Sequence, residues 1–564
     1  MLDIGALVKD NGLNNFVEVL IATLHGNTAG LKSGEIKRLE NIYRRRVSPG
    51  VFISPELGRY MTLISRELGR QVAVLIDRQG NIPLVLVGDN RGIEIPDLSD
   101  WPLAHRRLRG LRLVHTHLKS EPLTNDDMTD LALLRLDAIA AIGIQPDGFP
   151  GDIHIAHLLP PNPKGQAWAV IPGRPFHQLD INPEEFVTAL EDEMLRVQAE
   201  SFNVKDTREK AILISVMQKG KRAHQEEAME ELTELAYSAN VLVLDKAMQR
   251  PAKINPRYLM GEGKLKDIII TALQRGATLL IFDQELSPSQ VRSISELAEI
   301  KVIDRSQLIL DIFARRAKSR DGKVQVELAQ LKYCLPMLSG KGTELSRLMG
   351  GIGGRGPGET KLETDRRRVR DRISQLEKAL KELSQARVQR RSKRGGAGLP
   401  IISIVGYTNA GKSTLLNALT QSDTVVEDKL FATLDTASRR LRFPRDRDVI
   451  ITDTVGFIRD LPKPLMAAFK ATLEELGDAD LLLHVVDISN PRAYDQMASV
   501  DKILGELGLD EKPRLVVFNK SDLVDSDLAF IAARDQHGVA VSALDRKSFP
   551  PLMQELEDRL WPDG

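Results

Sequence analysis

The chain has 564 residues, which is enough for three or four domains and too long for a single small module. Its 78 Lys and Arg balance 78 Asp and Glu, so affinity for nucleic acid would have to come from a local basic surface. The single cysteine excludes an intramolecular disulfide. The chain start does not resemble a signal peptide, and apolar runs are shorter than the about 20 residues of a membrane span. We therefore expect a cytoplasmic protein without a membrane span.

Hydrophobic patterning predicts a multidomain α/β protein with four regions. The amino-terminal region and the region after it both alternate strand-like and helix-like segments. A basic helical segment follows, and the last region has the regular alternation of a doubly wound parallel sheet. The predicted bounds are 1–205 for an additional amino-terminal α/β domain, 206–320 for a smaller α/β domain, 321–397 for a basic helical arm and 398–564 for the doubly wound domain.

The first candidate site lies on a predicted strand of the amino-terminal region. His115 and His117 are two residues apart, so alternation along a strand places both imidazoles on one face. Asp127 follows ten residues later and could complete a zinc site with one open position. The alternative is a structural role, in which the two histidines are buried and bind no metal.

This pattern is similar to the H-x-H…S-x-x-D core of JAMM-type metallopeptidases, with Glu67 as a candidate for their catalytic acid. Two positions depart from that core, because Thr124 replaces the serine and Leu118 stands where proline is usual. The departures favour a degenerate scaffold over an active protease. We therefore do not expect zinc to be a cofactor.

The predicted arm combines an apolar stripe with a strong local charge. Val369, Ile373, Leu376, Leu380 and Leu383 recur at steps of four and three, which indicates one face of a helix, and 324–338 is its candidate partner. Residues 361–396 contain 13 Lys or Arg and five Asp or Glu, a local net charge of +8. Such a cluster can neutralise phosphates of folded RNA, or it can be a solvated helix face.

The last region opens with a phosphate-binding loop. The sequence GYTNAGKS, residues 406–413, follows a strand and precedes a helix, which is the context that G-x-x-x-x-G-K-S requires. The glycines allow backbone N–H groups to surround phosphate oxygens. Lys412 is predicted to contact the β- and γ-phosphates, and Ser413 to bind Mg²⁺.

Three further motifs follow in the order of a Ras-like P-loop GTPase. DTVG begins at Asp453, which is predicted to hold Mg²⁺ through water, and ends at Gly456, whose N–H can meet the γ-phosphate. NKSD ends at Asp522, whose two oxygens match the adjacent N1–H and N2–H₂ donors of guanine but not adenine. SAL, residues 542–544, is the expected cover for the base. These motifs predict binding of GTP and GDP.

Between the loop and DTVG, FATLD at 431–435 is the predicted switch that senses the γ-phosphate. Thr433 is preferred over Thr436 as its Mg²⁺ ligand. The predicted catalytic residues are Lys412, Thr433 and Gly456. The predicted GTP-binding residues are Gly406, Tyr407, Thr408, Asn409, Ala410, Gly411, Lys412, Ser413, Thr414, Phe431, Ala432, Thr433, Leu434, Asp435, Asp453, Thr454, Val455, Gly456, Asn519, Lys520, Ser521, Asp522, Ser542, Ala543 and Leu544.

Phe457 follows DTVG, where many GTPases have a glutamine that orients the attacking water. A phenyl ring can neither orient nor deprotonate water, so we expect slow intrinsic hydrolysis that a partner accelerates. Two interpretations of Phe457 stay open. A partner substitutes for the missing glutamine, or the ring simply packs against the sheet.

Together, these motifs resemble the HflX family of ribosome-associated GTPases. The resemblance rests on GYTNAGKST, FATLD, DTVGFIRDLP and above all GIGGRGPGETKLETDRR at 351–367, and it covers about residues 209–564. It implies Mg²⁺-dependent GTP hydrolysis, binding to the large ribosomal subunit, and splitting or rescue of stalled ribosomes. Only about 20 residues follow SAL, so we do not expect the separate carboxy-terminal domain that some members of the family have.

The resemblance also suggests contacts and ions. Asn409 matches an asparagine that coordinates a monovalent cation in some related GTPases, which makes K⁺ a second candidate ion beside Mg²⁺. We expect a monomer whose arm contacts ribosomal RNA through Arg355, Lys361, Arg366, Arg367 and Arg368. The alternatives are a GTP-regulated metallopeptidase-like protein and a GTP-dependent switch that binds a protein partner.

Overall fold

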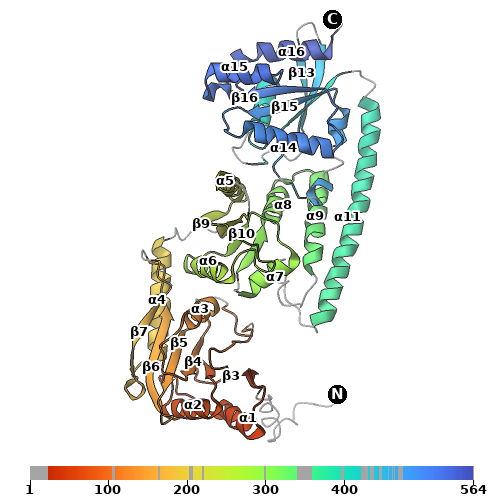
Figure 1. Ribbon diagram of the computed structural model, residues 1–564. Helices are drawn as coiled ribbons and strands as arrows, with labels where there is room; N and C mark the ends of the chain where they lie inside the picture. Colours follow the sequence, from red (N-terminus) through yellow and green to blue (C-terminus); the bar gives the residue numbers. More distant parts are fainter. Residues whose placement is uncertain are drawn as a thin grey trace, which may run out of the picture. The chain divides into compact units, whose positions relative to one another are not determined.

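The computed structural model describes residues 23–562 and divides them into two compact units, which are described separately (Figure 1). The first unit contains the residues up to 207 together with 262–276, and the second contains 208–261 and the residues from 277 onward. The description leaves out residues 99, 104–107, 163–164, 202–207, 219–221, 298–299, 339–357, 395–398, 421–429, 432–436, 444–446, 455, 460, 463 and 468–473.

The first unit is built on a seven-stranded mixed sheet in the order β1-β3-β2-β4-β5-β6-β7. Its central strands β2, β4 and β5 are almost wholly buried, as expected for strands covered on both faces. Strands β2 and β5 are mostly apolar, whereas β4 buries four polar side chains, those of Arg112, His115, Thr116 and His117. The strands are β1 (His25–Gly26), β2 (Val72–Asp77), β3 (Leu84–Val87), β4 (Leu111–His117), β5 (Ala138–Ile144), β6 (Pro150–Leu158) and β7 (Trp168–Pro175).

Helix α2 covers one face of this sheet, and its ends follow from local chemistry. Ser54 caps its first turn by accepting a hydrogen bond from the N–H of Leu57, and Gly69 ends it in a left-handed conformation. Leu57, Met61 and Ile64 are buried in the core that lies on that face. The helices of this unit are α1 (Ser33–Glu40), α2 (Pro55–Leu68), α3 (Asn125–Leu134), α4 (Pro183–Ser201) and α6 (Glu262–Gln274), with 3₁₀ turns η1 (Asn41–Arg44) and η2 (Phe176–Gln178).

The second unit begins with a smaller α/β domain. Its four strands are all parallel, in the order β11-β10-β8-β9. The strands are β8 (Lys210–Val216), β9 (Leu242–Gln249), β10 (Leu279–Phe282) and β11 (Lys301–Asp304). The helices that this unit contributes here are α5 (Arg222–Ser238), α7 (Pro288–Leu297) and α8 (Arg305–Arg316).

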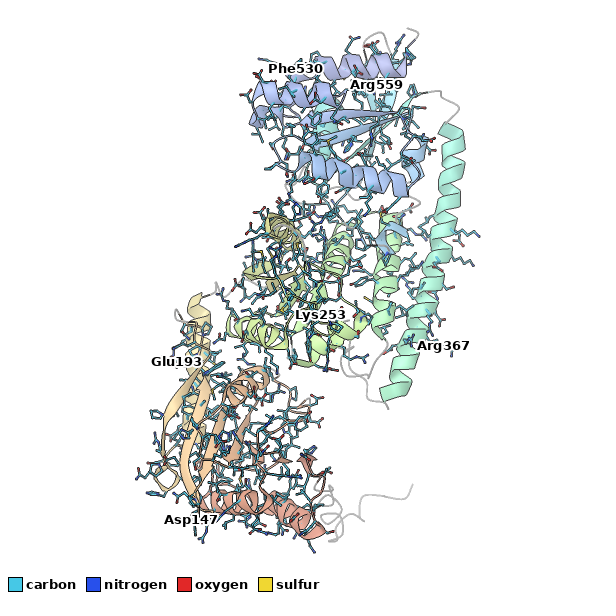
Figure 2. All side chains as sticks on the ribbon, viewed as in Figure 1. Asp147, Glu193, Lys253, Arg367, Phe530 and Arg559 are labelled. Atoms are coloured by element: carbon cyan, nitrogen blue, oxygen red, sulfur yellow. The ribbon has the colours of Figure 1, made fainter. Side chains whose placement is uncertain are left out.

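The predicted arm is a pair of packed helices. Helix α9 (Arg320–Cys334) is followed by the turn η3 (Leu335–Leu338), and α11 (Gly358–Arg394) lies alongside α9 (Figure 1). Leu376 on the apolar stripe of α11 is 4% exposed, and an Arg372–Glu327 ion pair of 2.7 Å joins the two helices. The structure thus confirms the predicted partner of the stripe. Arg367 is exposed on α11 (Figure 2).

The carboxy-terminal domain is the predicted doubly wound sheet, in the order β13-β14-β12-β15-β16-β17, with only β13 antiparallel among its described strands. Helices α12 and α16 pack on one face, and α14 and α15 pack on the other. The elements are β12 (Ile401–Gly406), α12 (Lys412–Thr420), β13 (Ala437–Phe443), β14 (Arg447–Asp453), η6 (Glu474–Asp478), β15 (Leu481–Asp487), α14 (Ala493–Glu506), β16 (Arg514–Asn519), η7 (Ser521–Leu523), α15 (Ser526–Asp535), β17 (Val539–Ala540), η8 (Arg546–Ser548) and α16 (Pro550–Leu560).

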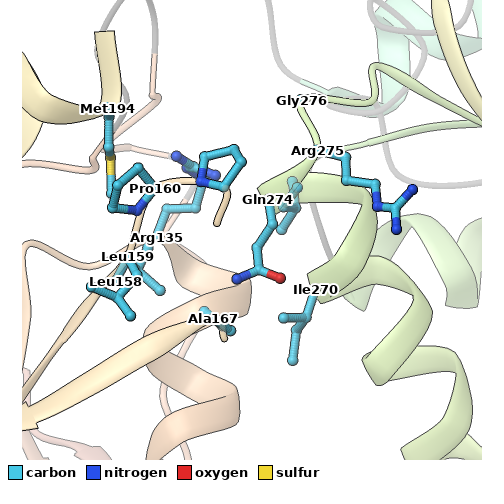
Figure 3. Close-up of a pocket in the computed structure, with 13 residues that line it drawn as sticks. Arg135, Leu158, Leu159, Pro160, Ala167, Met194, Ile270, Gln274, Arg275 and Gly276 are labelled. Carbon is cyan, nitrogen blue, oxygen red and sulfur yellow. The ribbon is translucent and has the colours of Figure 1, made fainter. Parts of the chain in front are cut away.

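A small pocket in the first unit is not a candidate for nucleotide binding. Its volume is about 50 Å³, and it is lined partly by Leu158, Pro160, Met194 and Ile270 (Figure 3). That volume holds a few water molecules, whereas pockets for small-molecule ligands have several hundred Å³. None of the helices in the described part of the chain combines the length and apolar composition that a membrane crossing requires.

Candidate nucleotide site

The phosphate loop lies where β12 ends and α12 begins, at the carboxyl edge of the sheet. Strand β12 is hydrogen-bonded to β14 on one side and β15 on the other. Gly406 has a φ of +150°, and a Cβ there would lie 2.2 Å from the carbonyl oxygen of Val485. Only glycine fits this close approach, so the sharp turn into the loop depends on it. The loop then reaches α12, whose first N–H groups are available for a phosphate.

Lys412 is buried at the centre of the loop. Its Nζ donates hydrogen bonds to the carbonyl oxygens of Gly406, at 3.1 Å, and Tyr407, at 2.7 Å. Burial lowers the pKa of Lys412 to about 8, and the nearby Asp453 carboxylate opposes that shift. A bound phosphate would favour the charged form, because it places negative charge beside the ammonium group.

This lysine predicts a pH dependence of nucleotide affinity. In the free protein Lys412 loses its proton as pH rises through about 8, so at higher pH binding must include proton uptake. Between about pH 7 and about pH 8.5 we expect GDP affinity to fall by about fourfold. Titration calorimetry in two buffers of different ionisation enthalpy measures the uptake directly. A constant affinity with no proton uptake would contradict the prediction.

Ser413 and Asp453 form the part of the site that fits Mg²⁺. The Ser413 Oγ donates to Asp453 Oδ2 at 2.6 Å, and Asp453, at the end of β14, is 1% exposed. Thr454 anchors the next turn by donating to the carbonyl oxygen of Ile404 at 2.6 Å. A hydroxyl and a carboxylate are the hard oxygen donors that Mg²⁺ prefers, and Mg²⁺ bound there would neutralise charge on the phosphates.

The backbone of the DTVG segment lies directly against the phosphate loop. The Thr408 N–H donates to the Phe457 carbonyl at 2.7 Å, and the Phe457 N–H donates to the Gly406 carbonyl at 3.1 Å. The Phe457 ring is 1% exposed and belongs to a hydrophobic cluster. The structure therefore confirms that this ring packs in the core, which was one of the two interpretations of this position.

The base-binding motifs come together on one asparagine. Asn519 Nδ2 donates to the Ala410 carbonyl at 2.9 Å, and its Oδ1 accepts from the Ala543 N–H at 2.9 Å. Lys520 has a positive φ and pairs with Asp487 at 2.6 Å. Asp522 is exposed in η7. The phosphate loop, NKSD and SAL are thus joined around Asn519, as their order at the strand ends predicts.

Some predicted residues lie outside the described part of the chain. These are Ala432, Thr433, Leu434, Asp435 and Val455 of the switches and Arg355 of the arm. Among the other predicted RNA contacts, Arg366 is half-buried and Arg368 is exposed on α11, which also includes Lys361. In the first unit, His115, His117 and Asp127 lie together, whereas the carboxylate of Glu67 forms an ion pair with Arg38.

The sequence did not predict a buried polar network that links the phosphate loop to the smaller α/β domain. The Tyr407 hydroxyl donates to Glu231 of α5 and accepts from the Arg459 N–H at 2.9 Å. Arg305, at the start of α8, pairs with Glu231 at 3.1 Å and with Asp283 at 3.4 Å. Burial, followed by the Glu231 charge, raises the pKa of Tyr407, so the phenol remains a donor.

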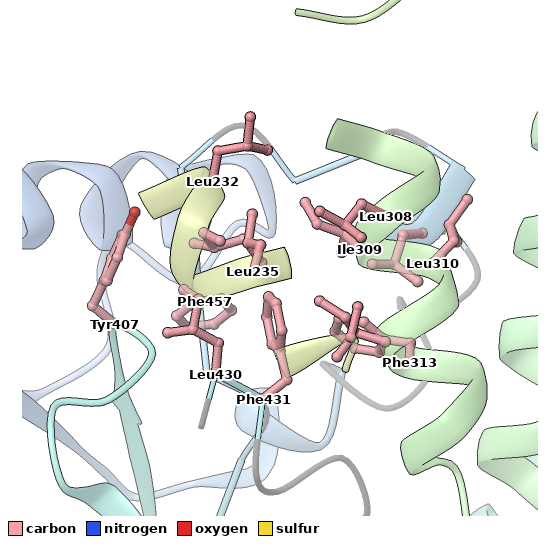
Figure 4. Close-up of a cluster of buried hydrophobic side chains, with 14 of the residues drawn as sticks. Leu232, Leu235, Leu308, Ile309, Leu310, Phe313, Tyr407, Leu430, Phe431 and Phe457 are labelled. Atoms are coloured by element: carbon pink, nitrogen blue, oxygen red, sulfur yellow. The ribbon is translucent and has the colours of Figure 1, made fainter. Parts of the chain in front are cut away.

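A hydrophobic cluster next to this network contains Tyr407 together with Phe431 of the FATLD segment and Phe457, which follows DTVG. Phe431 packs against Phe313 of α8 with ring centroids 4.6 Å apart, and Leu430 donates its N–H to Ser238 at 3.0 Å (Figure 4). Phe457 and Leu235 belong to the same cluster (Figure 4). Each contact joins residues distant in the chain, and the only local signal was the apolar character of these positions. The nucleotide loop and the smaller α/β domain therefore share one core.

Three family models match consecutive parts of the chain. The models are described as "GTP-binding GTPase N-terminal", "GTP-binding GTPase Middle Region" and "50S ribosome-binding GTPase", and they match residues 226–314, 316–394 and 401–520. The three matched ranges fall, in this order, mainly on the smaller α/β domain, the helical pair and the doubly wound domain, and they leave out β8 at the beginning and the residues after 520 at the end.

Curated relatives give the same result. A "GTPase HflX" of Caldanaerobacter subterraneus subsp. tengcongensis is 46% identical over 354 residues, which are 63% of this chain and 81% of the relative. A "GTPase HflX" of Escherichia coli is 43% identical and covers 64% and 84%. A GDP complex of a GTP-binding protein from Sulfolobus solfataricus is 27% identical, covers 63% and 98%, and has a TM-score of 0.34. The identity to the two GTPase HflX relatives, over more than four fifths of each, shows that the chain belongs to the HflX family of GTPases, which hydrolyse GTP.

Proposed function

We propose that this chain is a Mg²⁺-dependent GTP switch that acts on the large ribosomal subunit in ribosome splitting or rescue. The observation that supports it most is the buried contact between the phosphate-loop residue Tyr407 and Glu231 of the smaller α/β domain. The backbone next to DTVG is hydrogen-bonded to the same loop. A change at the γ-phosphate would therefore move residues that pack against the smaller α/β domain. GTP binding and the orientation or rigidity of the α/β domain are thereby coupled.

Guanine selectivity is assigned to Asp522. In Asp522→Asn the side-chain amide offers one donor where guanine needs two acceptors, so we expect GTP affinity to fall by about 30-fold or more. Xanthine has a carbonyl oxygen where guanine has its 2-amino group, so the variant should prefer xanthosine triphosphate. Competition between the two nucleotides in equilibrium binding measures this exchange. Equal loss of both nucleotides would instead indicate a misfolded base site.

The ribosomal target is supported by the charge of α11. The chain is neutral as a whole, but residues 361–396 carry a net charge of +8. Arg367 (Figure 2) and its neighbour Arg368 are both exposed. No aromatic residue interleaves these basic residues, so recognition of RNA phosphates and helix shape is favoured over stacking on single-stranded bases. The matched model for residues 401–520 is itself described as a ribosome-binding GTPase.

Charge reversal on α11 tests the target. We expect the triple variant Arg366→Glu, Arg367→Glu and Arg368→Glu to lose co-sedimentation with large subunits in a non-hydrolysable GTP analogue. GTP hydrolysis by the isolated chain should stay unchanged, whereas stimulation by ribosomes should disappear, because the arginines lie on α11 and outside the nucleotide site.

A matched control changes three exposed basic residues of the doubly wound domain, Lys502, Arg534 and Lys547, to glutamate. This control has the same change in net charge, so it separates a local contact from general attraction to RNA. Equal hydrolysis by the parent chain with and without ribosomes would overturn the proposal. Loss of sedimentation in the control variant alone would move the RNA contact to another surface.

A further inference from the structure

The first unit contains a cluster of donor atoms that lies outside the three matched family regions, which begin at residue 226. His115 and His117 are on β4, and Asp127 is in the first turn of α3. The geometry points to a metal site in which the two Nε2 atoms and the Asp127 carboxylate bind one Zn²⁺ ion, with water as the fourth ligand.

The fold places the two imidazoles on a single face of β4. Val114 and Thr116 alternate with them and face α2, where the Thr116 hydroxyl meets that of Ser65 at 2.8 Å. The histidines therefore lie on the opposite face, which α2 does not cover, and the carboxylate comes from the beginning of α3. His115 pairs in register with Ala73 and Ala141, and these small neighbours leave room beside its ring.

The distances match a tetrahedral zinc site. The two Nε2 atoms are 2.9 Å apart, and Asp127 Oδ1 is 3.2 Å from His115 Nε2, while Oδ2 is 3.6 Å from His117 Nε2. Ligands at about 2.0–2.1 Å from a tetrahedral zinc ion are separated from each other by about 3.3 Å. The three observed distances lie within about 0.4 Å of that spacing, and each histidine is near a different oxygen of the Asp127 carboxylate.

Hydrogen bonds outside the cluster orient two of the three donors, His117 and Asp127. His117 Nδ1 lies 2.8 Å from the Glu121 carbonyl, which can only accept, so Nδ1 carries the proton and Nε2 presents a lone pair. Thr124 donates to Asp127 Oδ2 from its N–H at 2.7 Å and from its hydroxyl at 2.8 Å. Oδ1 is thereby directed at His115. These contacts also form a capping box for α3, which accounts for the Asp127 rotamer but not for the approach of the two rings.

The arrangement is unsuited to histidines held by hydrogen bonds alone. The lone pair of His117 Nε2 and the oxygen Oδ1 both face His115 Nε2, so a single N–H would have to serve two acceptors. His115 Nδ1 is buried without a hydrogen-bond partner among the described residues, with or without a metal on Nε2, so the case for a metal rests on the three atoms that converge. A divalent cation satisfies all three converging donors at once, which is the usual reason for acceptors to gather in a buried place.

Burial and donor chemistry select zinc with one open position. The side chains of His115 and His117 are 1% and 2% exposed, and that of Asp127 is 17% exposed. Solvent can reach the cluster beside Asp127, but three additional ligands for an octahedral ion would require more space. Two imidazoles, one carboxylate and one water form a known zinc ligand set. The departures at Thr124 and Leu118 do not remove a ligand, so the proposal departs here from the sequence-based expectation that zinc is not a cofactor.

The test uses the full chain, stripped of metal with a chelator and kept free of nucleotide and Mg²⁺. We expect about one Zn²⁺ per chain by competition with a chromophoric chelator. Cobalt substitution should produce the visible absorption of a four-coordinate ion. The Asp127→Asn variant keeps a side-chain oxygen for the α3 cap but loses the carboxylate. Removing a residue that only contacts a metal ligand typically lowers metal affinity about 10–100-fold, and we expect this variant to lose more than that. The pair His115→Ala and His117→Ala should lose both signals.

Two controls identify the ion's location. His157→Gln changes another histidine of the same sheet, whose Nδ1 lies 2.9 Å from the Leu158 carbonyl, and it should retain the parent's zinc. Ser413→Ala should also retain it, because that variant alters only the Mg²⁺ site. The proposal fails if the parent takes up no stoichiometric zinc or if the double histidine variant binds as much as the parent. Should the double variant not fold, Asp127→Asn and the cobalt spectrum of the parent still decide, and none of these results depends on the GTPase activity.

Discussion

Replacing Gly411 with alanine is expected to lower GTP affinity by about 100-fold or more. Gly411 has a φ of +86°, a conformation that costs an L-residue about 1–2 kcal/mol. Its new Cβ would also lie 2.2 Å from Nδ2 of Asn519, which holds the Ala410 carbonyl and the Ala543 N–H. Relief of this clash must move either the phosphate loop or the asparagine that joins it to the base motifs. Equilibrium binding of GTP and GDP measures the loss.

Gly505 offers a matched control within the same domain. It lies near the end of α14, and a Cβ there would meet nothing within 4 Å. Gly505→Ala should therefore leave nucleotide affinity unchanged and stabilise the helix by up to about 1 kcal/mol. If Gly411→Ala bound nucleotide as tightly as the parent, the loop could shift without loss of affinity. That result would contradict the role assigned to Asn519.

The second large effect is expected from Glu231→Ala, which removes the centre of the buried network. Arg305, whose side chain is 5% exposed, would keep the Asp283 pair at 3.4 Å and a hydrogen bond to the Arg459 carbonyl at 3.2 Å, but it would lose its Glu231 partner. The Tyr407 hydroxyl would lose its carboxylate partner as well. Breaking a buried pair on one side typically costs about 3–5 kcal/mol, because the remaining charge stays buried. We expect a loss of about 3 kcal/mol in the free energy of unfolding of the second unit, measured by denaturant titration.

Glu227 lies one turn earlier on α5 and provides the comparison. It pairs with Arg492 at 3.6 Å, with both side chains partly exposed, and such pairs contribute about 0–1 kcal/mol. Glu227→Ala should therefore change the free energy of unfolding very little. Tyr407→Phe keeps the ring and removes only the hydroxyl, so it should cost about 1–3 kcal/mol and weaken the response of the α/β domain to nucleotide. Hydrogen exchange in α5 with GDP and with a GTP analogue measures that response, and an unchanged difference would refute the coupling.

The nucleotide motifs were readable from the sequence because each is a short segment at a strand end. Lys412, Ser413 and Asp453 lie where the strand and helix pattern places them, and the parallel sheet brings their strand ends to one edge. The same reasoning predicted the α9–α11 pair from the stripe at Val369 and Leu376. The family matches confirm the resemblance that these motifs indicated.

Alternation along β4 predicted that His115 and His117 share a face, since side-chain direction repeats every two residues. It could not predict that the two Nε2 atoms and the Asp127 carboxylate converge. That convergence depends on how the β4–α3 connection turns and on the contacts of Glu121 and Thr124. The distances needed for a metal site therefore came only from the folded unit.

The sequence alone was enough to predict which residues contact the nucleotide, because phosphate and base recognition use contiguous backbone and side chains. Only the tertiary structure decided which residues of the smaller α/β domain contact the predicted nucleotide-binding residues. Tyr407 meets Glu231 across 176 positions of the chain, and Phe457 packs in the core that the smaller α/β domain shares. Hydrophobic burial is non-directional, so an apolar or aromatic residue in a motif does not name its partner until the domains pack.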